Sequence, residues 1–317
     1  MSESKIEWTE STWEVTAGCK MVSSGCANCY AEKLVSTRFY GMAKTRKRDG
    51  TANGSPLDLS LKVIDPNTKK WNGHIELLSM NLEQPLKCKK PTVYFVNSRS
   101  DLFHPDVPFA YIDRVFAVMA LCPRHRFQVL TKRPERMAEY LKSRKPPEHG
   151  MIPRAIMDVL NDSSEGQNMT SRFRSHNDDR ISWPLNRVWL GTSVEDQDQL
   201  KRAWDLLKCP AAGRFLSCEP LLGPLDLDAL ELLLKEWRRS LTIGIYLDWI
   251  IVGGESGPGH RPCEIAWIRS IVEQCKSAGV PVFVKQDSGH KAGMQGRIPD
   301  DLWIKEVPDG LRSEAHG

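Results

Sequence analysis

The alternation of short apolar segments with helix-like segments is the feature that most restricts the fold of this chain. Apolar, β-branched segments begin near Trp8, Thr92, Phe127, Arg187, Arg214, Asp248 and Val280. Helix-like segments cover residues 28–40, 109–121, 134–141, 195–208 and 263–278. Nearly continuous apolar strands are typical of strands buried on both faces, and the alternation favours parallel βαβ units. Seven such strands predict an α/β barrel or partial barrel, with a doubly wound sheet as the alternative.

Two long stretches interrupt this alternation. Residues 41–91 contain the basic sequence KTRKR, and residues 143–186 are rich in Ser, Asn, Asp and Arg. Loops of this length are uncommon in compact domains, so each stretch could be a substrate lid, a partner surface or a disordered segment. The length of 317 residues fits one barrel domain, residues 1–317, that carries both insertions.

Composition restricts the class of protein only broadly. A hydrophobic content of 40% and a charged content of 26% are ordinary for a globular protein. The start MSESKIEWTE lacks the basic and apolar regions of a secretory signal, and no apolar stretch approaches the length of a membrane span. We therefore expect a cytoplasmic protein with no membrane association. The net charge of +4 permits an anionic substrate without requiring one.

Cysteine spacing gives the first indication of chemistry. The chain has nine cysteines, an odd number that argues against a disulfide framework and directs attention to metal binding or catalysis. Cys19, Cys26 and Cys29 lie together in GCKMVSSGCANCY, just before a helix-like segment. Thiolates are the usual iron–sulfur ligands, and three of them on a four-iron cluster leave one iron free to coordinate another molecule. We expect Gly18 and Gly25 to let this loop turn tightly around a cluster.

Zinc is the alternative metal. A structural zinc site needs four ligands, and Cys88 could supply a distant fourth, since no histidine precedes His74. The remaining cysteines lie in apolar or helix-like surroundings and are expected to be ordinary buried residues: Cys122, Cys209, Cys218, Cys263 and Cys275.

Seven segments of the sequence resemble a known family. They are SKIEWTESTW, the three-cysteine loop, VNSRSDLFHPDVP, FQVLTKRPERM, LGTSVEDQ, SCEPLLGPLDL and VGGESGPGHRP. Together they resemble a phage-associated family with a radical-SAM-like three-cysteine motif and undefined function, and the resemblance covers nearly the whole chain. It implies a barrel in which a [4Fe–4S] cluster binds S-adenosylmethionine (SAM), whose reductive cleavage releases a 5′-deoxyadenosyl radical.

The same resemblance implies roles for particular residues. Cys19, Cys26 and Cys29 would be the cluster ligands, and Tyr30 would border the adenine of SAM. Gly253, Gly254 and Glu255 resemble the GGE motif that contacts the SAM amino group, although here the motif follows a late strand. The first cysteine gap holds six residues, where the commonest pattern has three, so the loop is longer.

Polar residues at strand ends complete the predicted site. In α/β barrels the carboxyl ends of the strands and the loops that follow form the active face. This rule selects Ser98, Ser193, Glu219 and Lys285 as further cofactor-binding candidates. Glu219 and Lys285 each close an apolar strand, where a buried charge needs a partner, so they could pair with each other.

Two functions follow from these features. The first is a radical SAM enzyme that uses an external electron donor and acts on an unidentified substrate. A nucleic acid or nucleotide is one candidate substrate, because the KTRKR sequence could hold phosphate and four tryptophans could stack on a base: Trp8, Trp13, Trp183 and Trp189. The alternative is a non-enzymatic iron–sulfur or zinc protein that binds nucleic acid or a protein partner. The sequence indicates no oligomeric state.

Overall fold

The structure is a computed structural model that describes residues 6–48, 58–144, 151–162, 183–227 and 247–312. Its centre is a seven-stranded sheet in the order β1-β4-β5-β6-β7-β8-β9. Every neighbouring pair in this sheet is parallel. The strands are β1 (Ser11–Trp13), β4 (Val93–Val96), β5 (Arg126–Thr131), β6 (Val188–Ser193), β7 (Gly213–Cys218), β8 (Trp249–Gly253) and β9 (Val282–Gln286). All seven predicted strands are confirmed, as is the parallel α/β architecture.

The sheet curls into a partial barrel. The ring of Trp8 lies 4.7 Å from that of Phe95 on β4 and 6.1 Å from that of Trp249 on β8. In a flat sheet these two strands would be separated by four strand spacings, or about 19 Å. One indole can reach both strands only because the sheet bends around it.

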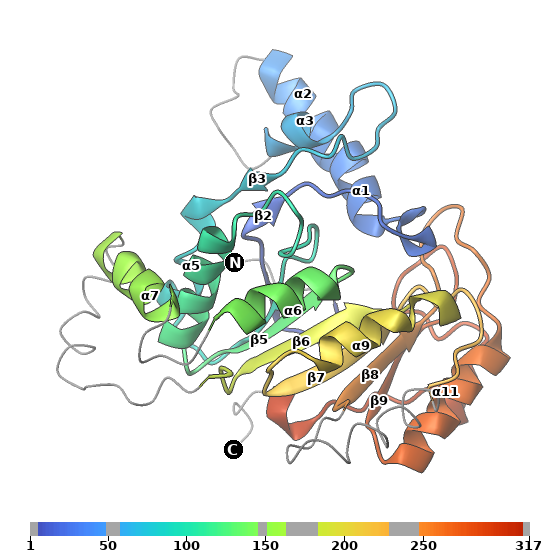
Figure 1. Ribbon diagram of the computed structural model, residues 1–317. Coiled ribbons are helices and arrows are strands. Elements are labelled where there is room, and N and C mark those ends of the chain that lie inside the picture. Colours follow the sequence, from blue (N-terminus) through green and yellow to red (C-terminus); the bar gives the residue numbers. More distant parts are fainter. Residues whose placement is uncertain (1–5, 49–57, 145–150, 163–182, 228–246, 313–317) are drawn as a thin grey trace.

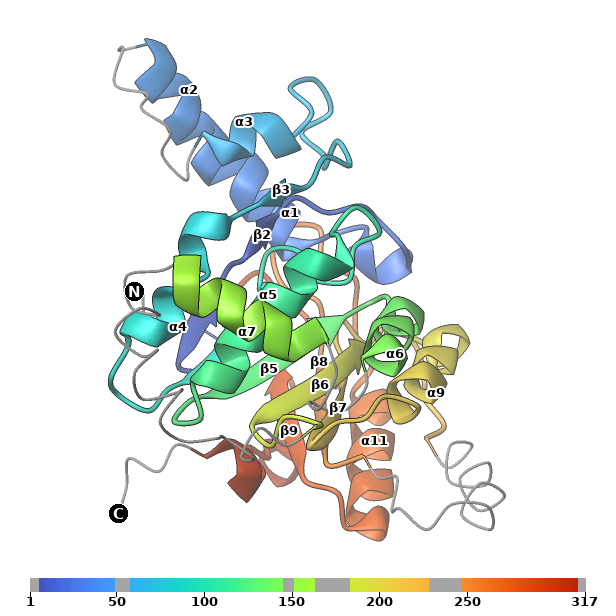
Figure 2. The same cartoon turned by 60° about the vertical axis from the view of Figure 1, so that its left-hand side comes forward.

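Helices cover the outer face of this sheet (Figures 1 and 2). They are α5 (Phe109–Leu121), α6 (Pro134–Ser143), α7 (Met151–Asp162), α9 (Lys201–Leu207) and α11 (Ile265–Ala278). The helices expected at 109–121, 134–141 and 263–278 are confirmed to within two residues at each end. The helix expected at 195–208 begins later, because Asp196 instead accepts a hydrogen bond from the Gln199 N–H and caps the short helix η4 (Gln197–Gln199).

The two faces of the sheet bury different side chains. Alternate residues such as Tyr94, Leu190 and Val252 face the helices and belong to the larger apolar core. The other residues face the inside of the curl and form a second core rich in aromatic rings: Trp8, Phe95, Trp189, Phe215, Trp249, Ile251, Phe283 and Leu311. Because both faces are buried, the strands read as continuous apolar runs in the sequence.

A long helix leads into the first insertion. The segment expected at 28–40 forms α1 (Tyr30–Leu34), continues through a π-helical turn at Val35–Phe39 and ends as α2 (Tyr40–Arg48). It is followed by α3 (Leu59–Val63), β3 (Glu76–Leu77), the short helix η3 (Ser79–Asn81) and α4 (Gln84–Lys87). Strand β3 pairs with β2 (Thr16–Ala17) in a small antiparallel sheet. In Figures 1 and 2, α2 and α3 project away from the barrel.

The second insertion contains helix α7, which packs against α5. The rest of the stretch that we considered as a disordered or mobile segment, residues 145–150 and 163–182, lies outside the described residues. Short helices also occur at η1 (Ser24–Cys26), η5 (Asp300–Leu302) and η6 (Asp309–Leu311). In the part of the chain that the structure describes, no helix is long and apolar enough to cross a membrane.

Candidate functional site

A cavity of about 630 Å³ lies at the carboxyl ends of the parallel strands. Nearly all residues that the sequence predicted for a site line it: Cys19, Cys26, Cys29, Tyr30, Ser98, Ser193, Glu219, Gly254, Glu255 and Lys285. Gly253 is the exception, because it ends strand β8 and does not reach the cavity wall. Parallel strands point their carboxyl ends to the same edge, so residues far apart in sequence converge there.

The cysteine loop, residues 18–29, supplies one wall of this cavity. Its three thiols all line the cavity, but among the described residues no three His, Cys, Asp or Glu side chains come close enough to hold a metal ion as they stand. Burial raises the pKa of Cys19 from 9.0 to about 12. Burial also raises the pKa of Cys29, although backbone N–H groups at the start of α1 act in the opposite direction. Metal binding at these thiols would therefore release protons.

Glycine has two different uses in this loop. Gly18 adopts a φ of +92°, a conformation that favours glycine, which confirms the expected turn. Gly25 does not have a positive φ and instead packs against Glu195, where an added Cβ would lie 2.3 Å from the carboxylate Oε1. Glycine is therefore needed at position 25 because the loop packs closely against Glu195, and not because the backbone turns there.

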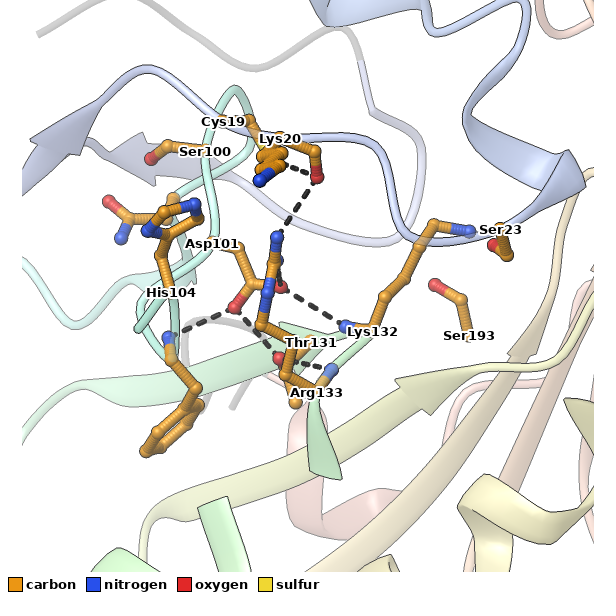
Figure 3. Close-up of polar contacts among 12 residues, drawn as sticks. Cys19, Lys20, Ser23, Ser100, Asp101, His104, Thr131, Lys132, Arg133 and Ser193 are labelled. Carbon is orange, nitrogen blue, oxygen red and sulfur yellow. Dashed lines mark hydrogen bonds and ion pairs between the residues drawn. The ribbon is translucent and has the colours of Figure 1, made fainter. Parts of the chain in front are cut away.

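A first buried carboxylate, Asp101, anchors the start of the loop (Figure 3). Asp101 forms an ion pair of 2.7 Å with Arg133 and accepts a hydrogen bond from the Thr131 hydroxyl. The second terminal nitrogen of Arg133 donates to the backbone carbonyl of Lys20 at 2.9 Å. The end of β5 thus holds the backbone next to Cys19.

A second carboxylate, Glu195, anchors the middle of the loop. Its side chain is fully buried and pairs with Lys132 and with Arg202, the latter at 2.7 Å. The Ser23 hydroxyl donates to Glu195 at 2.9 Å. The two cations hold the pKa of Glu195 below its usual value although burial acts in the opposite direction.

A third carboxylate, Glu255, anchors the end of the loop. Arg261 contacts it at 2.5 Å, and the side-chain amide of Asn28 donates to it at 2.9 Å. Arg261 also donates to the carbonyl of Ser24 at 2.9 Å. Burial alone would raise the pKa of Glu255, but these hydrogen bonds outweigh it and lower the pKa from 4.5 to about 2.

The other predicted residues differ in how available they are to a ligand. Glu219 and Lys285 form an ion pair of 2.5 Å within the cavity wall, which confirms the expected pairing. The Tyr30 hydroxyl donates to the Ser98 carbonyl at 2.5 Å, while half of the Tyr30 side chain is exposed. Within the described residues the Ser193 hydroxyl has no hydrogen-bond partner, and Ser193 is labelled in Figure 3.

The cavity also has an aromatic wall that our sequence reasoning missed. Trp8 and Phe95, from the inner core of the barrel, line it together with Ile6 and Leu130. The sequence indicates Trp8 only as one of four tryptophans that could stack on a base. Its position inside the curl depends on how far the sheet bends, which strand periodicity does not report.

The structure separates Cys88, the fourth ligand considered for zinc, from the cysteine loop. Cys88 follows α4 just before strand β4, and its sulfur contacts the Lys90 carbonyl and the Thr92 hydroxyl. It therefore lies at the amino-terminal end of β4, whereas the three loop cysteines lie at the carboxyl ends of the strands. No histidine lines the cavity among the residues that the structure describes.

The fold and the site define a class: a parallel α/β partial barrel whose strand ends surround a cysteine-lined ligand cavity. The chain belongs to the family described as "Protein of unknown function (DUF5131)", which matches residues 3–306. That description assigns no chemistry to the site.

Other comparisons add little. A search of curated proteins gave no match. A solved structure, "Spore photoproduct lyase complexed with dinucleoside spore photoproduct", is similar with a TM-score of 0.37 and 13% identity, covering 80% of this chain and 57% of that chain. This chain thus spans less than two thirds of that protein. A TM-score this low supports no conclusion about fold or function.

Proposed function

We propose that this protein binds a [4Fe–4S] cluster through Cys19, Cys26 and Cys29 and is a radical SAM enzyme. The observation that carries the proposal is the placement of three thiols from one loop on one cavity at the carboxyl ends of parallel strands. Catalytic groups of α/β barrels gather at this face.

The donor set fits an iron–sulfur cluster better than zinc. Three thiolates suffice for a four-iron cluster that keeps one iron open, whereas a structural zinc site needs a fourth protein ligand. Neither Cys88 nor any histidine lines the cavity among the described residues. When bound and reduced, the cluster would supply the electron that cleaves SAM to a 5′-deoxyadenosyl radical.

The remaining wall suits a ligand that carries both an ammonium and a carboxylate group. The Glu219–Lys285 pair offers one charge of each sign. In place of their contact with each other, the Glu219 carboxylate can bind the ammonium group of SAM and the Lys285 ammonium can bind the carboxylate of SAM. Ser193 offers a free hydroxyl, and the half-exposed ring of Tyr30 offers a face for the adenine. Gly254 and Glu255 would border the same ligand, with Glu255 already bound to Arg261 and Asn28.

The proposed reaction needs an external one-electron donor, and its substrate is unidentified. A nucleic acid or nucleotide is the candidate substrate, since aromatic rings and cations both border the cavity.

Anaerobic reconstitution with iron and sulfide tests the proposal. We expect the dithionite-reduced cluster to show a change in its electron paramagnetic resonance spectrum when SAM is added, and the protein then to release 5′-deoxyadenosine. The triple substitution of Cys19, Cys26 and Cys29 by Ser should abolish iron binding, while Cys88→Ser should leave it unchanged. Unchanged iron content in the triple variant would show that the cluster assignment is wrong. If the protein holds a cluster whose spectrum does not change with SAM, and SAM is not cleaved, the protein is instead a non-enzymatic iron–sulfur protein.

A further inference from the structure

The positive charge of the protein is concentrated in one projecting part of the chain, here called the basic arm and defined as residues 30–48 and 58–77. These two segments contain nine Lys and Arg but four Asp and Glu, an excess of five, whereas the whole chain has an excess of four. The rest of the chain therefore carries no net positive charge. The sequence KTRKR, residues 44–48, ends helix α2 in this arm.

The acidic residues of the arm are largely neutralised within it. Glu32 is buried, forms an ion pair of 2.9 Å with Lys70 and accepts the Trp71 backbone N–H. Glu76 pairs with Lys62 at 2.5 Å. Asp65 accepts the backbone N–H groups of a turn. On the α1–α2 helix, the side chains of Arg38 and Lys44 are exposed to solvent.

The arm is joined to the mouth of the cavity. Its first helix starts directly after Cys29, and Lys33 donates to the carbonyl of Pro258 across the mouth at 2.8 Å. On the other side, the guanidinium of Arg99, which lines the cavity, lies 5.2 Å from the ring of Phe39. A polymer bound along the arm would therefore run to the cavity.

The cysteine loop and the first residue of the arm carry exposed apolar side chains. Met21, Val22 and Tyr30 are 54%, 42% and 50% exposed, and Val22 and Tyr30 line the cavity. An exposed aromatic ring on a cavity whose lining also includes Lys20 and Arg99 suits single-stranded nucleic acid, because bases stack on the ring and cations hold the phosphates.

From the charge distribution and this geometry, we infer that the basic arm binds the phosphodiester backbone of a nucleic acid and directs a strand across the cavity mouth. The inference deepens the proposed function by naming the surface that holds the substrate. Nucleic-acid binding at the arm needs neither iron nor SAM, so it can be tested independently of the proposed function.

Fluorescence anisotropy of the full chain with a labelled single-stranded oligonucleotide of about 20 nucleotides, longer than one typical binding site, tests the inference. The arm variant replaces Lys44, Arg46, Lys47 and Arg48 by Gln, which preserves helix propensity. The control variant replaces Lys142, Lys201, Lys208 and Lys276, which lie on or directly after helices of the outer face, by Gln. Both variants lose the same charge.

We expect the arm variant to bind at least tenfold more weakly at low salt, and the control to bind like the wild type within a factor of about three, since each lost phosphate contact removes counterion release. The slope of log affinity against log salt should flatten by up to about 3 in the arm variant, at about 0.7 for each contact with a single strand. The triple cysteine variant should retain wild-type binding.

Three outcomes would overturn the inference: no binding by the wild type at low salt, equal losses in the arm and control variants, or equally strong displacement of the oligonucleotide by polyglutamate of matched charge. The last outcome would identify an acidic protein as the partner. Circular dichroism of both variants confirms that a loss of binding does not come from unfolding. Iron content and 5′-deoxyadenosine release, measured on the same samples, report separately on the proposed function.

Discussion

At the scale of single residues, three buried carboxylates fix the cysteine loop. Asp101, Glu195 and Glu255 follow three different strands, and each is paired with at least one cation. A buried carboxylate without a partner would be costly, so each ion pair also specifies where its strand end and the loop must meet. The loop is thereby held in place by protein contacts of its own.

Glu255 makes this arrangement testable through pH. Its pKa in the folded protein is about 2, below the ordinary 4.5. A carboxyl group whose pKa is lowered by folding stabilises the protein above its unfolded-state pKa and loses that contribution as pH falls toward its folded pKa. We therefore expect Glu255→Gln to lower the free energy of unfolding at pH 6–8, and the difference from wild type to shrink between about pH 4.5 and pH 2.

Urea denaturation of wild type and variant across this pH range measures the difference. Glu273→Gln, an exposed position on α11, is the matched control and should change stability little at any pH. A deficit for Glu255→Gln that stays constant down to pH 2 would contradict the ionic role of Glu255.

At the scale of elements, the cysteine loop depends on close packing against the strand ends. Gly25 lies so near Glu195 that a methyl group at this position would overlap the carboxylate. Gly41, at the start of α2, has no atom within 4 Å of an added Cβ. Replacing these two glycines by alanine is therefore expected to have opposite effects on the free energy of unfolding.

We expect Gly25→Ala to lower the free energy of unfolding by about 1–3 kcal/mol through overpacking and to reduce iron incorporation. Gly41→Ala should raise it by about 0.5–1 kcal/mol, because alanine favours the helix, and should leave iron incorporation unchanged. Chemical denaturation and iron analysis of both variants provide the comparison. Normal stability and iron content in Gly25→Ala would refute the tight contact with Glu195.

At the scale of the whole molecule, residues near the start of the described chain close the curl of the sheet. Among the described strands, β1 and β9 are the edges, and they do not pair with each other. Glu7 bridges toward the β9 side through an ion pair of 2.5 Å with Lys305, and Trp8 fills the interior. The curvature of the sheet and the depth of the cavity therefore depend on the segment that contains Glu7 and Trp8.

We expect Trp8→Ala to lower the free energy of unfolding by about 3–5 kcal/mol, the usual cost of removing a buried aromatic ring. Trp8→Phe retains a ring against Phe95 and Trp249 and should cost less than half as much. Equilibrium denaturation measures both changes. A cost for Trp8→Ala below that of Trp8→Phe would show that the indole does not pack as the structure indicates.

Periodicity in the sequence was sufficient to predict all seven strands and most of the outer helices, because strands buried on both faces read as continuous apolar runs. The spacing of Cys19, Cys26 and Cys29 singled out the loop, and the strand-end rule selected nearly all of the cavity residues. Both signals are local in sequence, or follow from the direction in which parallel strands run.

Only the tertiary structure determined which group each side chain contacts. Glu255 lines the cavity and is also bound to Arg261 and Asn28, and Gly25, expected to turn, is packed on Glu195. The aromatic wall formed by Trp8 and Phe95, and the exclusion of Cys88, depend on sheet curvature and on which end of β4 a residue lies. The loop cysteines were evident from the chain itself, but their anchoring depends on contacts between segments more than 100 residues apart, which local sequence does not encode.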